Sequence, residues 1–168
     1  MNQLQDRIAQ FRKMANDDPE NELGHFRLGQ LLMEAGQHEE AVRSFQRTLE
    51  LSPQFSKVYQ LLGTCLLKED KRDEALKIAR ANVKLLPASY NLAAIYAQNG
   101  QPEKALAFLK RHFYQYERYQ SVRTKEMMEA RVDAVFDSLR SDPAFLALTR
   151  DADGRLQMPM GLRSDANK

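Results

Sequence analysis

Apolar side chains recur every three or four residues along most of this chain, which is the spacing of an amphipathic helix. The pattern predicts one helix over residues 3–15 and a pair of helices over residues 23–35 and 38–51. A second pair is expected to carry the apolar positions 58–67 and then 75–86. No alternation of Val, Ile and Thr bounded by a tight turn predicts a strand. We therefore expect an all-α protein.

The helical pattern repeats every 34 residues. Pro19, Pro53 and Pro87 are separated by this interval, and so are Gly29 and Gly63. A period of this length is typical of stacked helix pairs, each of which cannot bury its apolar face alone. A third copy follows at an interval of about 30 residues, with the missing residues just after Pro87. Its first helix is therefore expected to be shorter by about one turn.

Helices are expected to close both ends of the repeated region. The N-terminal helix is similar to the second helix of a repeat whose first helix is missing, so we interpret it as a cap. Near the other end, an apolar stripe predicts one helix that carries Met128, Val132, Val135, Phe136 and Leu139. The run Ser141-Asp142-Pro143 then supplies an N-cap and a first-turn proline for a last short helix.

The predicted organisation is one helical repeat domain over residues 1–150. It consists of a capping helix (1–20), two full repeats (21–54 and 55–87), a shortened third repeat (88–119) and closing helices (120–150). Residues 151–168 contain Gly, Pro and scattered charges without periodicity, so we expect a flexible tail there.

The repeated residues resemble the tetratricopeptide repeat family. The first copy contains Phe26-Arg27-Leu28-Gly29, Leu32, Gly36, Ala41, Phe45 and Pro53. The second copy contains Tyr59, Leu62-Gly63, Leu66, Ala75 and Pro87. The third copy contains Leu92-Ala93, Tyr96, Gly100 and Ala105. The resemblance implies a helix-turn-helix solenoid of about three repeats between capping helices. The chain departs from the family pattern at His25 and Tyr59, where a tryptophan is usual, and at Thr48 and Asn82, where a small alanine is common.

Small residues recur in phase within the repeats. They are Gly29, Ala41, Gly63, Ala75, Ala93 and Ala105. We expect them to let the two helices of each pair approach closely, while larger side chains pack between pairs.

The resemblance implies a concave wall that is built from the first helix of each pair. The residues expected on it are Phe26, Arg27, Gln30, Met33, Lys57, Gln60, Thr64, Leu67, Tyr90, Asn91 and Ala94. This mixture of apolar and hydrogen-bonding side chains suits an extended segment or an amphipathic helix of a partner protein. Phe26, Met33, Leu67 and Tyr90 are the expected apolar anchors. The alternative is that these apolar side chains pack only on neighbouring helices of the same chain.

The predicted function is therefore a non-enzymatic adaptor or assembly scaffold that binds another protein. One alternative is a small chaperone that shields a client protein. A second, weaker alternative is nucleic-acid binding through residues 110–125, where aromatic and basic residues alternate. Against it, Leu109, His112, Phe113 and Tyr116 fall on one helical face and are expected to be buried against residues 127–139. The sequence leaves self-association open.

Composition narrows the choice further. The net charge of +2 gives no overall electrostatic preference for nucleic acid or membranes. No apolar run has the length of a signal peptide or a membrane span, and the single cysteine suits a reducing compartment, so we expect a cytoplasmic protein. His25, His38 and His112 lie on different predicted helices, and Cys65 lies within an apolar stripe as a buried thiol. We expect no cofactor and no metal site.

Overall fold

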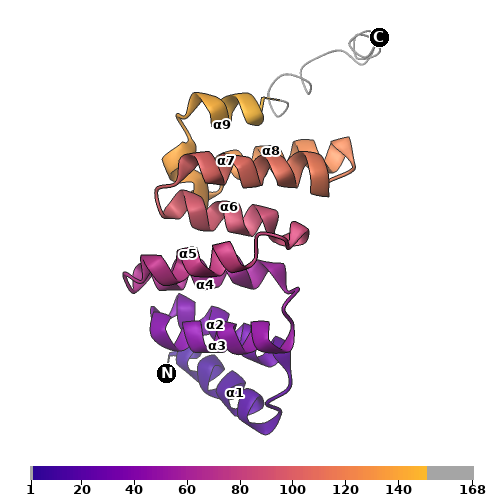
Figure 1. Cartoon of the computed structure of the whole chain (residues 1–168). Coiled ribbons are helices and arrows are strands. Elements are labelled where there is room, and N and C mark those ends of the chain that lie inside the picture. Colours follow the sequence, from indigo (N-terminus) through magenta and orange to yellow (C-terminus); the bar gives the residue numbers. More distant parts are fainter. Residues whose placement is uncertain (1, 151–168) are drawn as a thin grey trace.

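The structure is a computed structural model that describes residues 2–150, and every regular element in this range is a helix (Figure 1). The α-helices are α1 (Gln3–Asp17), α2 (Glu22–Glu34), α3 (His38–Leu51), α4 (Ser56–Lys68), α5 (Arg72–Ala81), α6 (Ser89–Gln98), α7 (Pro102–Arg111), α8 (Gln120–Val132) and α9 (Pro143–Leu148). Three short elements join them: η1 (Leu86–Ala88), the π-turn η2 (His112–Tyr116) and η3 (Ala134–Leu139). The predicted tail, residues 151–168, lies outside the described residues.

The helices stack as successive layers along one axis, from α1 at one end to α9 at the other (Figure 1). α1 packs on α2, and the hairpins α2–α3, α4–α5 and α6–α7 follow in order. This arrangement confirms the predicted all-α solenoid with helices at both ends. α6 has 10 residues, whereas α2 and α4 have 13 each, as the shorter third interval predicts. Among residues 2–150, no helix is both long enough and apolar enough to span a bilayer.

The same turn joins the two helices of each hairpin. Gly36, Asp70 and Gly100 occupy equivalent positions, with φ of 74°, 57° and 71°. In each turn the next residue donates its backbone N–H to a carbonyl five positions earlier, at 2.8 Å, 2.8 Å and 2.9 Å. These are the bonds of a Schellman motif, which needs a left-handed residue at this point. Glycine adopts that conformation readily, whereas Asp70 does so at a cost.

The two repeated glycines serve different contacts. A Cβ atom on Gly29 would lie 2.6 Å from Cε1 of Phe45, a fully buried ring in the partner helix of the same hairpin. A Cβ atom on Gly63 would lie 2.6 Å from Cγ1 of Ile95 in α6. The first finding agrees with the prediction of close approach within a pair. The second corrects it, because Gly63 allows close approach between two successive repeats.

The second helix of the second repeat is shorter than predicted. It ends at Ala81, so Val83 is exposed and Leu86 belongs to η1. The side-chain amide of Asn82 donates to the Ile78 carbonyl at 2.8 Å, the acceptor that its own backbone N–H would need for the helix to continue. The backbone N–H of Asn82 instead reaches the carbonyl of Ala79, at 3.3 Å. The predicted continuation to Leu86 is therefore wrong.

The predicted closing helix is broken into two parts. α8 buries Met127 and Ala130, whereas Met128 and Val132 are 46% and 75% exposed. Asp133 adopts an extended conformation and accepts a hydrogen bond from the backbone N–H of Val135, so η3 begins in a new phase. η3 does bury two of the predicted residues, Phe136 and Leu139. After it, Asp142 caps α9 as predicted, accepting from the N–H groups of the second and third residues that follow it.

Candidate protein-binding surfaces

The predicted wall residues lie on the first helices of the three hairpins, α2, α4 and α6, which we call the first-helix face. The structure exposes them to different degrees. Arg27 and Lys57 are exposed; Gln30, Met33, Thr64, Leu67 and Tyr90 are partly buried; and Phe26, Gln60, Asn91 and Ala94 are buried.

Phe26 is packed within its own chain. Its ring centroid lies 4.5 Å from that of Phe55 and 6.3 Å from that of Phe45. The guanidinium of Arg27 lies 5.8 Å from the Phe26 ring centroid and also donates to Oε1 of Gln30 at 3.0 Å. Phe26 therefore packs on side chains of its own chain. This is the alternative given above for the apolar wall residues.

Tyr90 is also held by the chain itself. Its ring makes edge contacts with Phe136 and His112, with centroids 5.3 Å and 5.4 Å apart, and its hydroxyl donates to Oδ2 of Asp133 at 2.9 Å. Burial raises the pKa of Tyr90, and the neighbouring carboxylate of Asp133 raises it further. Ser138 in η3 donates to the carbonyl of Ala97 at 3.3 Å, so η3 packs along α6 and its own side chains occupy this part of the wall.

An open cleft of about 380 Å³ lies where the N-terminal ends of α4 and α6 meet α8. We call it the inner cleft; its lining is Ser56, Lys57, Pro87, Tyr90, Asn91, His112, Glu126, Glu129 and Asp133. It therefore brings together three predicted residues, Lys57, Tyr90 and Asn91, with three carboxylates from the closing region. One of these carboxylates, Glu126, lies 2.9 Å from Nε2 of the buried His112.

Two buried polar side chains on this face have unsatisfied hydrogen-bonding groups. Asn91 is only 8% exposed, lines the inner cleft, and its amide makes no hydrogen bond with any residue in the range 2–150. Oε1 of Gln60 is also buried without a partner among these residues. Thr64, one turn further along α4, instead donates to Oε1 of Gln98 at 3.3 Å. The Asn91 amide lines the open cleft and can therefore be reached by solvent or a partner, whereas Oε1 of Gln60 is shielded from both.

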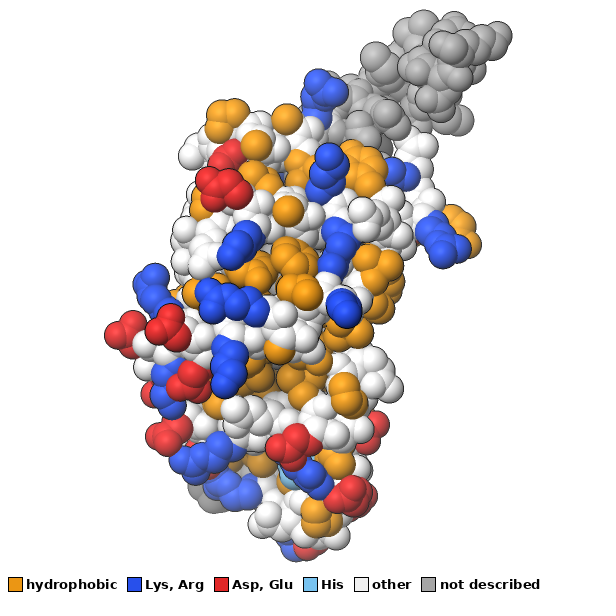
Figure 2. Space-filling view, viewed as in Figure 1, with side chains coloured by type: hydrophobic (Ala, Val, Ile, Leu, Met, Phe, Trp, Pro, Cys, Tyr) orange, Lys and Arg blue, Asp and Glu red, His pale blue; other side chains and the backbone are white. Residues whose placement is uncertain are grey.

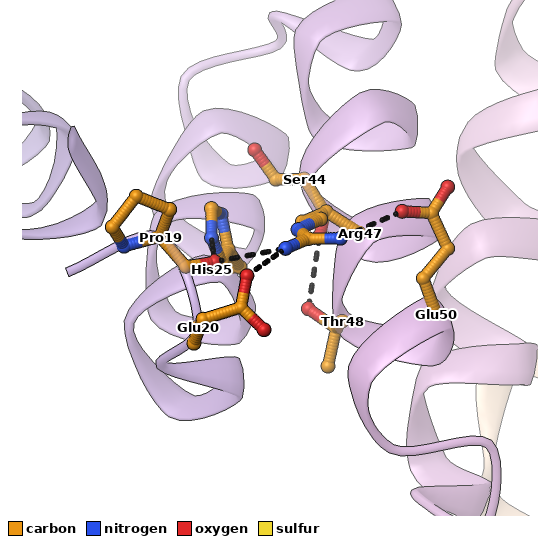
Figure 3. Close-up of polar contacts among 7 residues, drawn as sticks. All are labelled: Pro19, Glu20, His25, Ser44, Arg47, Thr48 and Glu50. Atoms are coloured by element: carbon orange, nitrogen blue, oxygen red, sulfur yellow. Dashed lines mark hydrogen bonds and ion pairs between the residues drawn. The ribbon is translucent and has the colours of Figure 1, made fainter.

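The opposite face is formed by the second helices α3, α5 and α7, and we call it the second-helix face. In the first repeat, Arg47 of α3 closes this face against the preceding linker (Figure 3). Its guanidinium donates to Oε1 of Glu20 at 2.6 Å, to the Pro19 carbonyl at 3.3 Å and to Oε2 of Glu50 at 3.1 Å. His25, one of the departures from the family pattern, donates to the same Pro19 carbonyl at 2.9 Å. We call this set of contacts the Arg47 clamp.

The second repeat has no equivalent clamp. The residues 34 positions after Pro19, Glu20, Arg47 and Glu50 are Pro53, Gln54, Ala81 and Lys84. Tyr59 repeats the role of His25, since its hydroxyl donates to the Pro53 carbonyl at 2.6 Å. Ala81, however, has no side chain that could reach the linker.

A groove lies where the clamp would be. We call it the outer groove; its first part, about 650 Å³, is lined by Pro53, Gln54, Tyr59, Arg80, Ala81, Asn82, Val83, Lys84 and Leu85. A second part of about 490 Å³ adjoins it, lined by Gln46, Leu49, Glu50, Tyr59, Leu62, Ile78 and Asn82. The parts share Tyr59 and Asn82. The sequence prediction missed this surface, although the 34-residue period already places Ala81 at the position of Arg47.

The outer groove is basic. No residue that lines its first part is acidic, and neither Arg80 nor Lys84 forms an ion pair with any residue in the range 2–150. Figure 2 shows the same bias more broadly: blue side chains predominate over the upper layers, α5 to α7, whereas red and blue are mixed over α1 to α3. The groove thus combines apolar side chains with unpaired cations.

Comparison with known families identifies the repeat. Models described as tetratricopeptide repeat match residues 6–56, 32–81 and 86–111, which together make up more than half of the chain. This chain belongs to the tetratricopeptide repeat family.

Solved structures of tetratricopeptide repeat proteins share its fold. MamA superposes with a TM-score of 0.54 at 19% identity, covering 86% of this chain and 84% of MamA. YrrB, described as a TPR protein with an unusual peptide-binding site, superposes with a TM-score of 0.52 at 19% identity, covering 99% of this chain and 84% of YrrB. A search of curated protein sequences gives no match. At these identities the likeness establishes the fold and, through the family, a protein–protein interaction module.

In this tetratricopeptide repeat protein some of the basic and aromatic side chains of residues 110–125 are used internally, while Tyr114, Tyr116 and Tyr119 are exposed. Leu109, His112 and Phe113 are buried as predicted, although Tyr116 is exposed. Arg111 donates to Oγ of Ser89 at 2.8 Å and to the carbonyl of Val83. The guanidinium of Arg123 lies 5.2 Å from the ring centroid of Tyr114. These contacts leave Tyr119 as the most exposed aromatic ring in the segment.

Cys65 lies in the core of this repeat protein. Its side chain is buried, and burial together with the nearby Glu69 raises its thiol pKa to about 11. A thiol with this pKa is protonated at neutral pH and is a poor nucleophile. Within residues 2–150, no group of three or more His, Cys, Asp and Glu side chains is placed to hold a metal ion.

Proposed function

We propose that this protein is an adaptor or assembly scaffold that binds a segment of a partner protein along its first-helix face. Met33 and Leu67 occupy the same position in successive repeats, as do Gln30 and Thr64, and all four are partly exposed. They form an apolar strip beside a polar strip, which suits an extended chain or one face of a helix. Phe26 and Tyr90 support this wall and are not themselves anchors.

The observation that carries the proposal is the free amide of Asn91. The Asn91 side chain is mostly buried, but its amide atoms are not among those shielded from solvent, so its hydrogen-bonding capacity is open to a ligand or water. In the inner cleft it can donate to a partner carbonyl and accept from a partner N–H. Main-chain groups of a bound segment supply both.

Electrostatics favours one orientation of the partner. Glu126, Glu129 and Asp133 surround the inner cleft, against a single lysine, Lys57. A lysine or arginine of the partner is therefore favoured at this end of the wall, where complementary charge speeds encounter and sets register. Tyr90 is held by its contacts with Phe136, His112 and Asp133, so this side of the inner cleft is preformed and loses little conformational entropy on binding. The buried, unpaired Cys65 is compatible with a reducing compartment such as the cytoplasm.

The test uses the full chain as bait for crosslinked partners in cells of its native host. Met33→Glu with Leu67→Glu should abolish capture, because both substitutions place charge in the apolar strip. Met14→Glu with Leu146→Glu is the matched control, since it makes the same charge change at exposed apolar positions elsewhere. Asn91→Leu should weaken capture while helical circular dichroism stays unchanged. Capture that survives the Met33 and Leu67 substitutions would contradict binding at this face.

A further inference from the structure

We infer that the outer groove is a second docking site, on the face opposite the proposed wall, and that it takes an acidic segment of a partner that also carries an apolar side chain. This inference goes beyond the proposed function, because neither Met33 nor Leu67 lines the groove. Three observations carry it: the missing clamp, the lining of the groove, and the stability of its rim.

The missing clamp explains why the space is open. In the first repeat the guanidinium of Arg47 lies between the linker and α3, bonded to Pro19, Glu20 and Glu50. In the second repeat the equivalent residue is Ala81, so the corresponding volume is a groove. The linker itself still has the same arrangement, because Tyr59 bonds the Pro53 carbonyl as His25 bonds that of Pro19. A side chain of a bound partner can thus occupy the space in the second repeat that corresponds to the space filled by Arg47 in the first repeat.

The lining determines which side chains fit. Val83 and Leu85 offer apolar contact surface beside the ring of Tyr59, which is only 4% exposed. Arg80 and Lys84 are exposed, form no ion pair among the described residues, and face no acid in the first part of the groove. The acid of the adjoining part, Glu50, is already paired with Arg47 at 3.1 Å. Charge complementarity therefore selects an aspartate or glutamate next to an apolar residue.

The rim of the groove is fixed by contacts from another repeat. Arg111 of α7 donates to the carbonyl of Val83 and, through Nε, to Oγ of Ser89 at 2.8 Å. Ser89 also donates to the Leu86 carbonyl at 2.6 Å. The turn after α5 is therefore tied to the third repeat, and the groove is preformed. A preformed site loses less conformational entropy on binding than one that must be ordered.

The experiment measures binding of a short fluorescein-labelled peptide that alternates glutamate with leucine, by fluorescence anisotropy and by amide chemical shifts. We expect saturable binding, with the largest shifts at residue 54 and residues 80–85. Arg80→Glu with Lys84→Glu should weaken it by about tenfold or more, since both opposite charges become like charges. The matched control is Arg7→Glu with Lys68→Glu, which changes the net charge equally at exposed sites outside the groove and should have little effect.

Several outcomes would overturn the inference. One is no binding of the acidic peptide at millimolar concentration, and another is equal weakening in both double variants. A third is equal binding of a peptide in which lysine replaces glutamate. A single-stranded oligonucleotide that binds more tightly than the peptide and depends on Arg80 and Lys84 would show that the groove takes nucleic acid instead. None of these results bears on the first-helix face, which the Met33 and Leu67 variant tests separately.

Discussion

The first and second hairpins descend from the same 34-residue pattern but are held together differently. In the first, Gly29 allows the Phe45 ring to pack closely within the hairpin, and Arg47 closes the second-helix face. In the second, Gly63 allows close packing on α6 of the next repeat, and Ala81 leaves that face open. In a solenoid, one repeat can thus be stabilised by contacts within its own hairpin, while its neighbour is stabilised by contacts with the following repeat. The second arrangement leaves an outer surface free for binding.

Alanine at the two glycines should give the largest effects. The Cβ of Gly29→Ala would lie 2.6 Å and 2.8 Å from two atoms of the Phe45 ring, which must shift. Because real Cβ atoms essentially never approach this closely, we expect an overpacking cost in the upper half of about 1–3 kcal/mol. Helix propensity returns about 1 kcal/mol, which leaves a net loss of about 1–2 kcal/mol in urea unfolding. Gly63→Ala should lose a similar amount, through Ile95.

Hydrogen exchange then separates the two variants. Gly29→Ala should increase exchange in α2 and α3, whereas Gly63→Ala should increase it in α4 and α6. Gly24→Ala is the control, because its Cβ would meet only Asn21, at 3.6 Å, and stability should not fall. Increased exchange confined to α4 and α5 in Gly63→Ala would contradict the contact across repeats.

Removal of the clamp should make the first hairpin resemble the second. Arg47→Ala loses the bonds to Pro19, Glu20 and Glu50, and we expect a loss of about 1 kcal/mol in the free energy of unfolding. Arg43→Ala serves as the control, because its single exposed ion pair with Glu39 should contribute less than about 0.5 kcal/mol. Equal losses of unfolding free energy in the two variants would show that the Arg47 clamp stabilises the protein no more than an ordinary surface ion pair does.

The reverse change should make the second hairpin resemble the first. Gln54→Glu with Ala81→Arg restores the residues found at Glu20 and Arg47. We expect a gain of about 0.5 kcal/mol in thermal unfolding, together with weaker binding of the acidic peptide, since the new side chain occupies the groove. Gln54→Glu alone is the control for the added charge. Unchanged peptide binding in the double variant would separate the groove from the missing clamp.

The smallest effect at neutral pH concerns Cys65 in α4. Its pKa of about 11 lies above the ordinary value of 9.0, so the thiol stays protonated and should react negligibly with a disulfide reagent at pH 8 while the protein is folded. The stability linked to this group is fully present below pH 9 and decreases as the pH rises toward 11. Cys65→Ala should reduce that decrease. Fast reaction at pH 8 would show that α4 opens readily.

The sequence predicts the helices and their turns well, because both depend on local patterns. Gly36, Gly100 and the Asp142 cap all act as their positions predict. The end of α5 was missed because it depends on a side-chain bond from Asn82 that competes with the helix. The sequence does not predict which side of α8 is buried, because Asp133 adopts an extended conformation and α8 and η3 do not form one continuous helix.

The binding surfaces were harder to predict, since they depend on contacts between distant segments. The sequence places Tyr90 on the wall, but it does not show that η3 and α8 would pack against that ring. The outer groove follows from the period only once Arg47 is known to reach the Pro19 carbonyl. Pattern thus predicts which residues share a face, and packing decides which of them remain free.

The most direct measurement is amide hydrogen exchange in the turn after α5, compared between the natural chain and the Gln54→Glu with Ala81→Arg variant. We expect the new arginine to close the outer groove and slow exchange at residues 82–85, which lie outside α5, whereas Gln54→Glu alone leaves exchange there unchanged. No change in the double variant would contradict the claim that one missing arginine opens the second-helix face.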